Sequence, residues 1–205
     1  MSDEADRAAR KVGTQEKRRQ ELVEAAFHLI AERGFEGLRT RDIAAAAGLN
    51  IATVHYYFPT KESLIGAVVE HAMERFRSTL TSDGSPVEQL RNHLRAVRHL
   101  LNDEPQVGVV MGELALRSAR DPSIGSIMGS SNDQWHRLIR GLLRRAAKAG
   151  QIRPELDSDD VASLVMSTLA ATTLPTMASG ARSGQALRQL ERWLGLPKQI
   201  VQSSD

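Results

Sequence analysis

Apolar residues recur every three or four positions along most of the chain, which is the spacing of one face of an α-helix. The first such stripe ends at Gly34, a residue type that favours the end of a helix, and consists of Leu22, Ala25, Ala26, Leu29 and Ile30. The apolar run from Val107 to Met111 is too short to outweigh the helical signals around it. The pattern therefore predicts an all-α protein of about nine helices.

Two short helices are expected around a glycine turn after this stripe. Thr40 is placed to cap the first helix, and Gly48 supplies the permissive backbone for the turn. Asn50 is placed to cap the second helix, which Pro59 ends. The alanines at 44–47 leave little bulk between the two helices, so they can cross closely. This arrangement is typical of a helix-turn-helix.

The second short helix has two faces with different character. Val54 and Phe58 lie four residues apart and share one face, which indicates packing against the rest of the unit. The other face, which is free to touch a partner, carries Ala52, His55 and Tyr56. Adjacent helical residues cannot face one direction, so either Tyr56 or Tyr57 must point outward or sideways.

Capping signals define the helices that follow. Thr60 can cap a long helix over about 61–80, and Ser85 to Glu88 form a capping box with proline at the first helical position. Pro105 and Pro122 open two more helices, the second of which continues to the stop at Gly150.

The last two helices are expected at about 159–178, capped by Ser158, and at about 184–194, capped by Ser183 and stopped by Gly195. The first of them is apolar around nearly its whole circumference, so it needs neighbours on all sides. These neighbours can come from an internal core of one chain or from the same two helices of a second copy. The residues expected at such a dimer interface are Leu164, Thr168, Ala171, Leu187, Leu190, Trp193 and Leu194.

Composition narrows the class of protein. The 205 residues are 41% hydrophobic and 25% charged, which suits one small head and one larger body. The 27 Lys and Arg against 25 Asp and Glu leave a formal charge of +2, so any basic patch must be local. The absence of cysteine excludes disulfides and thiolate metal sites, and the stretch 161–181 is too polar to cross a membrane. We expect a cytoplasmic protein.

The expected domains are a flexible tail at 1–13, a DNA-binding head at 14–60, a helical body at 61–196 and a flexible tail at 197–205. The basic residues of the first tail are consistent with a solubilising end or with an arm that touches phosphates.

The head resembles the tetracycline-repressor (TetR) family of bacterial transcriptional regulators. The resemblance lies in R-R-Q-E-L-V-E-A-A-F-H-L-I-A-E-R-G-F at 18–35, T-R-D-I-A-A-A-A-G at 40–48 and T-V-H-Y-Y-F-P-T-K-E-S-L at 53–64. It implies a three-helix DNA-binding domain followed by a helical domain for ligand binding and dimerisation. The sequence departs from the family at Ile51 and Ala52, where a polar or basic residue is frequent, and at His55, where an aromatic is usual.

The resemblance implies contacts with double-stranded DNA. The positions that meet phosphate oxygens in the family are Thr40, Arg41, Thr53, Tyr57 and Lys61, next to the helix cap Asn50. The residues that remain to contact the DNA bases are Arg41, Ile51, Ala52, His55 and Tyr56. Past its cap the second short helix holds no Arg, Lys, Gln or Asn, so we expect Arg41 to read a guanine, and Ile51 and Ala52 to press against thymine methyl groups.

The resemblance also implies a small-molecule effector in the body. The candidate pocket residues, each of which can equally be core filler, are Phe76, Met111, Leu114, Met128, Trp135 and Met166. The cluster of basic residues between Arg137 and Lys148 is most simply a solvated face. No catalytic residue, metal ligand set or cofactor motif is found, so an enzyme is not expected.

The sequence thus predicts a homodimeric repressor that binds a palindromic operator and is released by a small-molecule effector. The alternative is a dimeric DNA-binding regulator controlled by a protein partner or by its own concentration.

Overall fold

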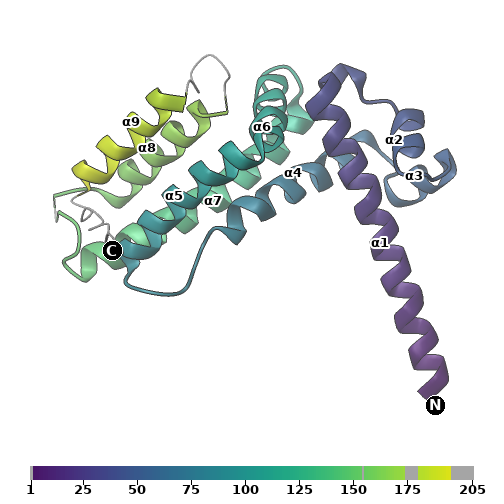
Figure 1. The fold of residues 1–205 in the computed structure, drawn as a ribbon, viewed down its shortest axis with the longest axis horizontal. Helices are drawn as coiled ribbons and strands as arrows, with labels where there is room; N and C mark the ends of the chain where they lie inside the picture. The colour runs from purple at the N-terminus through teal and green to yellow at the C-terminus, as the bar shows by residue number, and fades with distance from the viewer. Residues whose placement is uncertain (1, 154, 174–179, 195–205) are drawn as a thin grey trace, which may run out of the picture. The chain divides into compact units, whose positions relative to one another are not determined.

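The computed structural model describes residues 2–153, 155–173 and 180–194, and these residues form helices and no strand, as the hydrophobic pattern predicted (Figure 1). Within these ranges the order of elements is α1 (Ser2–Arg33), the 3-10 helix η1 (Phe35–Gly37), α2 (Thr40–Ala46), α3 (Ile51–Tyr57), α4 (Lys61–Ser78), α5 (Pro86–Asp103), α6 (Pro105–Ser118), α7 (Pro122–Lys148), α8 (Ser158–Ala171) and α9 (Gly180–Trp193).

The chain divides into two compact units. The head unit contains the chain up to Met73 and the segment Glu113–Met128, and the body unit contains Glu74–Gly112 and the chain from Gly129 onward. Three helices, α4, α6 and α7, contribute residues to both units. The compact units divide inside these helices, whereas the domain boundary was predicted at residue 60, before α4.

Helix α1 begins earlier than expected. Residues 2–13, predicted to be a flexible tail, are the first turns of a helix of 32 residues. The sequence S-D-E-A-D-R-A-A-R-K is rich in alanine, arginine and lysine, which favour helices, and it places acidic residues in the first turn. These propensities extend the helix beyond its apolar stripe.

Three predicted caps are confirmed. The Asn50 Oδ1 accepts from the backbone N–H of Thr53 at 2.8 Å, and the Thr60 hydroxyl accepts from the backbone N–H of Ser63 at 3.1 Å. The capping box is formed in both directions between Ser85 and Glu88. Each of these bonds satisfies an N–H group that has no partner inside the helix.

Two predicted caps are wrong. Arg39 is the N-cap of α2, without a side-chain hydrogen bond, and Thr40 is the first helical residue. Asp157 rather than Ser158 caps α8, because its carboxylate accepts from the backbone N–H groups of Asp159 at 2.8 Å and Asp160 at 3.0 Å. A carboxylate also suits the positive end of the helix dipole better than a hydroxyl does.

The last two helices differ from the prediction in length. Helix α8 ends at Ala171, where the hydroxyls of Thr172 and Thr173 donate to the carbonyls of Leu169 and Ala170 and so compete with the helical ladder. Helix α9 begins at Gly180 instead of 184. The predicted stop at Gly195 and the tail at 197–205 lie outside the described residues.

The head unit has a small core. The stripe of α1 is buried, and the aromatic rings of Phe27 and Phe35 are buried with it. Ile43 of α2 and Val54 of α3 are buried as well, so the two short helices pack by their apolar faces. This packing fixes which face of α3 remains open.

The body unit contains a buried polar chain that the sequence did not indicate. His93 is fully buried, and its Nε2 accepts from the indole N–H of Trp135 at 2.9 Å. Its Nδ1 then carries the proton and donates to the hydroxyl of Thr79 at 2.6 Å, which in turn donates to the carbonyl of Phe76 at 2.7 Å. Burial lowers the pKa of His93 to about 4, so the ring is neutral at physiological pH.

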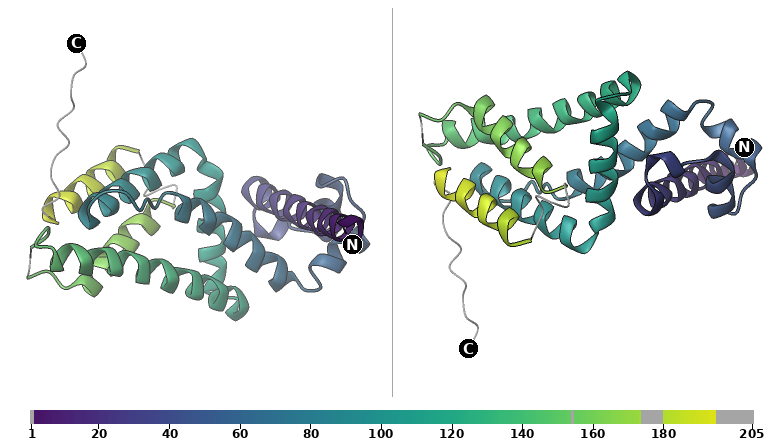
Figure 2. Two further views of the ribbon diagram at one scale, coloured as in Figure 1. Left: turned by 90° about the horizontal axis from the view of Figure 1, so that it is seen from below. Right: turned by 90° about the horizontal axis from the view of Figure 1, so that it is seen from above.

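Helices α8 and α9 pack side by side within the body unit (Figures 1 and 2). Leu187 and Leu190 of α9, and Leu194 directly after it, are buried in this single chain, which corrects their predicted place on a dimer surface. Their spacing makes one apolar stripe, and α9 contacts α5 and α8. Among the described residues, no helix combines the length and the apolar character that crossing a bilayer requires.

Candidate nucleic-acid interface

Helix α3 is held in place at both ends. Gly48 adopts a positive φ of 65° at the turn from α2, where a side chain would be strained. Asn50 caps the first turn, and its Oδ1 also accepts from the Thr53 hydroxyl at 2.9 Å. The backbone N–H of Phe58 bonds the carbonyl of Val54, and Pro59 follows. The position of the helix is thus determined by its own sequence and by the core beneath it.

The outward face of α3 exposes two large hydrophobic side chains. Ile51 is 47% exposed and Tyr56 is 69% exposed, and Ala52 and His55 are exposed beside them. Val54, on the opposite face, is buried. Large apolar side chains that gather on one exposed face indicate a binding surface. The division of the two faces is the one that the sequence predicted.

The two adjacent tyrosines point in different directions. Their rings meet edge to face with centroids 5.0 Å apart, and Tyr57 is half-buried while Tyr56 is exposed. The contact with the Tyr57 ring restricts the orientation of the Tyr56 ring. Tyr57 therefore borders the outward face.

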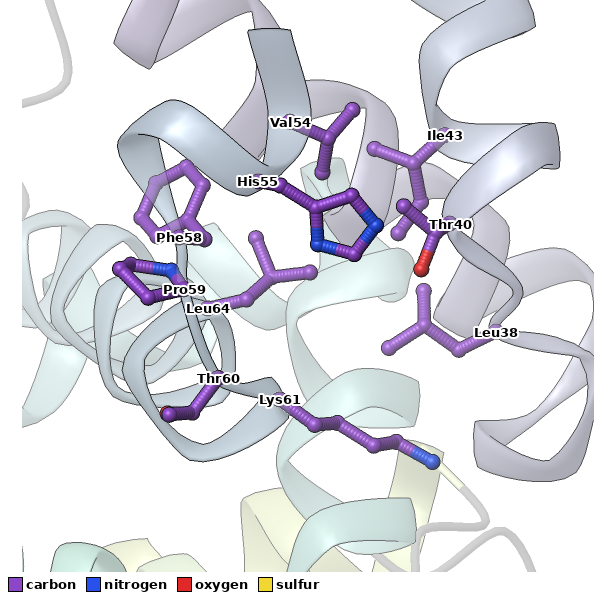
Figure 3. A pocket seen from close by; sticks show the side chains of 10 residues that line it. All are labelled: Leu38, Thr40, Ile43, Val54, His55, Phe58, Pro59, Thr60, Lys61 and Leu64. Atoms are coloured by element: carbon purple, nitrogen blue, oxygen red, sulfur yellow. The ribbon is translucent and has the colours of Figure 1, made fainter. Parts of the chain in front are cut away.

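Three of the predicted phosphate-contact or base-contact residues line one small cavity. Thr40 from α2, His55 from α3 and Lys61 from the start of α4 surround a space of about 100 Å³ (Figure 3). In this view His55 extends toward the Thr40 side of the cavity, and Lys61 runs along its α4 edge. Leu38, Ile43, Val54, Phe58, Pro59 and Leu64 also line this cavity, so its wall is mainly apolar.

Phe35 places Lys61 through a contact that sequence reasoning missed. The Lys61 Nζ lies 4.0 Å from the centre of the Phe35 ring, and the Arg117 guanidinium lies 4.9 Å from it. Glu113 accepts from the Phe35 backbone N–H at 3.0 Å, and Arg117 forms an ion pair with Glu36. Glu113 and Arg117 belong to α6, and no local pattern pairs residues 78 or 81 positions apart in sequence.

Arg41 is available for a partner. Its side chain is 65% exposed, and its only ion pair among the described residues is a long one, 3.6 Å, to the neighbouring Asp42. An exposed pair of this kind contributes little free energy, so the guanidinium can move to another acceptor at low cost. Thr53 is less available to a partner as a donor, because its hydroxyl already donates to the Oδ1 of Asn50.

The six effector candidates do not assemble in one unit. Phe76 and Trp135 are buried and their ring centres lie 5.1 Å apart in the body unit, which also holds Met111 and the half-buried Met166. Leu114 and Met128 belong to the head unit. None of the six lines the cavity of Figure 3 or the two further grooves described on α1 and α7. Among the described residues, no group of three or more side chains is arranged to hold a metal ion.

Two family models match this chain. The model described as bacterial regulatory proteins, tetR family, matches residues 22–68, which contain α2, α3 and the whole buried stripe of α1. The model described as tetracyclin repressor-like, C-terminal domain, matches residues 80–190. Together the two models cover most of both compact units.

Named relatives and solved structures agree with these models. The chain is 28% identical over 167 residues to the HTH-type transcriptional repressor KstR2 of Mycobacterium tuberculosis, covering 80% of this chain and 82% of that protein. It is 28% identical over 152 residues to the HTH-type transcriptional regulator LuxR of Vibrio harveyi, covering 72% and 73%.

A TetR transcriptional regulator from Chloroflexus aurantiacus superposes with a TM-score of 0.76 at 25% identity, covering 89% of this chain and 96% of that one. The structure of the ketosteroid transcriptional regulator KstR2 of Mycobacterium tuberculosis superposes with a TM-score of 0.60 at 26% identity, covering 87% and 93%.

Proposed function

This chain belongs to the tetR family of bacterial regulatory proteins, and from that premise we propose that it is a homodimeric repressor whose heads bind a palindromic operator and whose body releases the DNA on binding a small molecule. As a member of this family it is a DNA-binding transcriptional regulator and not an enzyme. Its relative KstR2 is named a transcriptional repressor, which supports the direction of control.

The outward face of α3 is the observation on which the DNA-binding proposal rests. Ile51 and Ala52 can meet thymine methyl groups, and Arg41 at the start of α2 can reach a guanine. Thr40, His55 and Lys61 supply donors beside this face for phosphate oxygens. Base readout and backbone contacts thus come from adjacent parts of one rigid head.

An exposed face of α8 supports the dimer. Leu164 is 43% exposed, Trp193 of α9 is 55% exposed, and Thr168 and Ala171 of α8 are half-buried. Covering Leu164 and Trp193 with the same residues of a second copy would remove both from water. Two heads held by such an interface would read half-sites about 34 to 36 Å apart, or a multiple of that.

Selection of bound duplexes from a random DNA library tests the DNA-binding proposal. We expect the full chain to recover an inverted repeat, and Tyr56→Ala to weaken binding to it while leaving the fold intact, because Tyr56 is exposed. Leu116→Ala, an equally exposed change on α6, is the matched control and should bind as the unaltered protein does. Recovery of a sequence without inverted symmetry would contradict the palindromic operator.

The effector proposal rests on the family and on the aromatic contact between Phe76 and Trp135. A thermal-shift screen of small molecules separates it from the alternative, control by a protein partner or by concentration. A ligand at a hundred times its dissociation constant adds about 2.7 kcal/mol to the free energy of unfolding. A stabilising compound must also lower operator affinity. If stabilising compounds leave operator affinity unchanged, the alternative is favoured.

A further inference from the structure

The basic cluster of α7, expected to be a solvated face, lines a groove along one side of the body unit. The groove has a volume of about 420 Å³. It is bounded by residues 80–82 after α4, by Gln89 of α5 and by the α7 residues from Arg137 to Arg145. All of these residues belong to the body unit. Two of the five basic residues in this cluster, Arg137 and Arg145, line the groove, and the other three do not.

The α7 side of the groove contains a notch between two arginines. Arg137, Gly141 and Arg145 are spaced by four residues, so they form one row along the helix. Gly141 has no side chain, and the Arg145 Nη1 lies 3.5 Å from the position that a Cβ of Gly141 would occupy. The guanidinium of Arg145 is therefore folded back over the notch. Leu138 and Leu142 form the next row and supply an apolar floor.

The opposite wall is fixed before any ligand arrives. The side-chain amide of Gln89 donates to the carbonyl of Ser82 at 2.8 Å and to that of Gly84 at 3.0 Å. These two bonds tie the segment that follows α4 to the first turns of α5. A preformed wall lowers the conformational entropy that binding would cost.

The charges of the groove are not compensated within the described part of the chain. Arg140, on another face of α7, forms an ion pair with Asp159 at 2.9 Å. For Arg137 and Arg145 no ion pair is found among the described residues, and no Asp or Glu lines the groove. Leu138 beside them is 41% exposed. Two unpaired guanidinium groups next to an exposed leucine favour a ligand that is both anionic and apolar.

We propose that this groove binds an amphipathic carboxylate. The carboxylate lies at the Gly141 notch and accepts from the guanidinium groups of Arg145 and Arg137, and the apolar body covers Leu138 and Leu142. Arginine suits this role because its planar fork matches a carboxylate. The site is independent of the proposed operator binding, since it uses residues of the body unit alone.

Isothermal titration calorimetry of the full chain with sodium octanoate tests the proposal. Octanoate combines a carboxylate with an apolar chain, n-octanol lacks the charge and acetate lacks the chain. Loss of one charge-assisted hydrogen-bonding partner should weaken octanoate binding about tenfold in Arg145→Gln. Gly141→Leu should abolish binding because its side chain fills the notch. Arg144→Gln is the matched control, since Arg144 is exposed on the same helix and does not line the groove.

The supporting result is saturable octanoate binding that Arg145→Gln weakens, that Gly141→Leu abolishes and that Arg144→Gln leaves within about twofold. Octanol and acetate should each bind more weakly than octanoate. Equal effects of Arg145→Gln and Arg144→Gln would show attraction to general charge and overturn the site. Unchanged binding in Gly141→Leu, or no saturable binding with a dissociation constant below about 1 mM, would overturn it as well.

Discussion

Arg41 is the one cationic side chain of α2, and the proposed readout of a guanine depends on it. Past Asn50, α3 offers no Arg, Lys, Gln or Asn, so hydrogen-bonded readout of a purine depends on a residue outside that helix. The exposure of Arg41 and its weak pairing with Asp42 leave its guanidinium free to turn toward DNA. In the proposed complex, apolar contacts from Ile51 and Ala52 add preference for thymine.

Arg41→Ala should cost about 1 to 3 kcal/mol of operator binding and relax selectivity at one position of each half-site. The check is a titration of the variant against the selected operator and against operators changed at single positions. Arg120→Ala, which removes an exposed charge elsewhere in the head unit, is the control and should keep selectivity. A uniform loss of affinity for every sequence would make Arg41 a phosphate contact instead.

His93 makes the stability of the body depend on pH. Burial lowers its pKa to about 4 in the folded chain, whereas in the unfolded chain an imidazole takes up a proton near pH ~6.5. Stability from this residue is therefore fully present above pH ~6.5 and is lost as pH falls toward 4, because only the unfolded state binds the proton in that window.

The free energy of unfolding should fall by about 3 kcal/mol between pH ~6.5 and pH ~4 because of this residue. Urea unfolding at a series of pH values measures the change. His93→Gln should be less stable at neutral pH but should lack this part of the pH dependence. Identical pH profiles for the two proteins would contradict a neutral, buried His93.

At the scale of elements, local signals decided where most helices begin. The capping box at Ser85 and the prolines that open α6 and α7 are read directly from the sequence, because each satisfies or removes a backbone N–H within a few residues. At the start of α8 the sequence predicted Ser158 as the cap, but the adjacent Asp157 can cap as well. Only the bonds in the folded chain distinguish them.

Asp157→Ala should lower the melting temperature by about 2 to 4 °C, while Ser158→Ala should leave it nearly unchanged. The backbone N–H groups of Asp160 and Asp159 hold the pKa of Asp157 below its usual range, so the carboxylate is charged at neutral pH. The difference between the two variants should shrink as the pH falls through that lowered pKa, because the cap is then protonated in the unaltered protein too. If the Asp157→Ala and Ser158→Ala variants had equal melting temperatures at neutral pH, Asp157 would not be the dominant cap.

At the scale of the whole molecule, the proposed function requires two copies of this chain. Within one chain, Leu187, Leu190 and Leu194 are already buried, so they cannot form the contact surface. Leu164 and Trp193 are exposed, and they are the residues whose burial a second copy would complete. The dimer interface should therefore be smaller than the one predicted from the sequence. It should be centred on the outer face of α8 and the end of α9.

Leu164→Glu should weaken dimerisation by about 30-fold or more, since it places a charge at the centre of an apolar contact. Sedimentation over a range of protein concentrations measures this, and operator affinity should fall in parallel. Leu116→Glu is the control, because Leu116 is 66% exposed on α6, in the head unit. A Leu164→Glu protein that still sediments as a dimer would move the interface elsewhere.

The sequence by itself determined the elements and their faces. The spacing of Val54 and Phe58 was sufficient to predict which side of α3 is buried, and Gly34, Gly48 and Gly150 marked turns that do adopt positive φ. These features depend on interactions within one helix or one turn, so they are present in any short window of the chain.

The tertiary structure alone decided which distant residues meet. The contact of Phe35 with Lys61 and Arg117, the bonding of His93 by Trp135 and the burial of Leu187 each join residues or helices far apart in sequence. A periodic pattern indicates that a face is apolar but not what covers it, because the partner of that face is selected by packing of the whole chain.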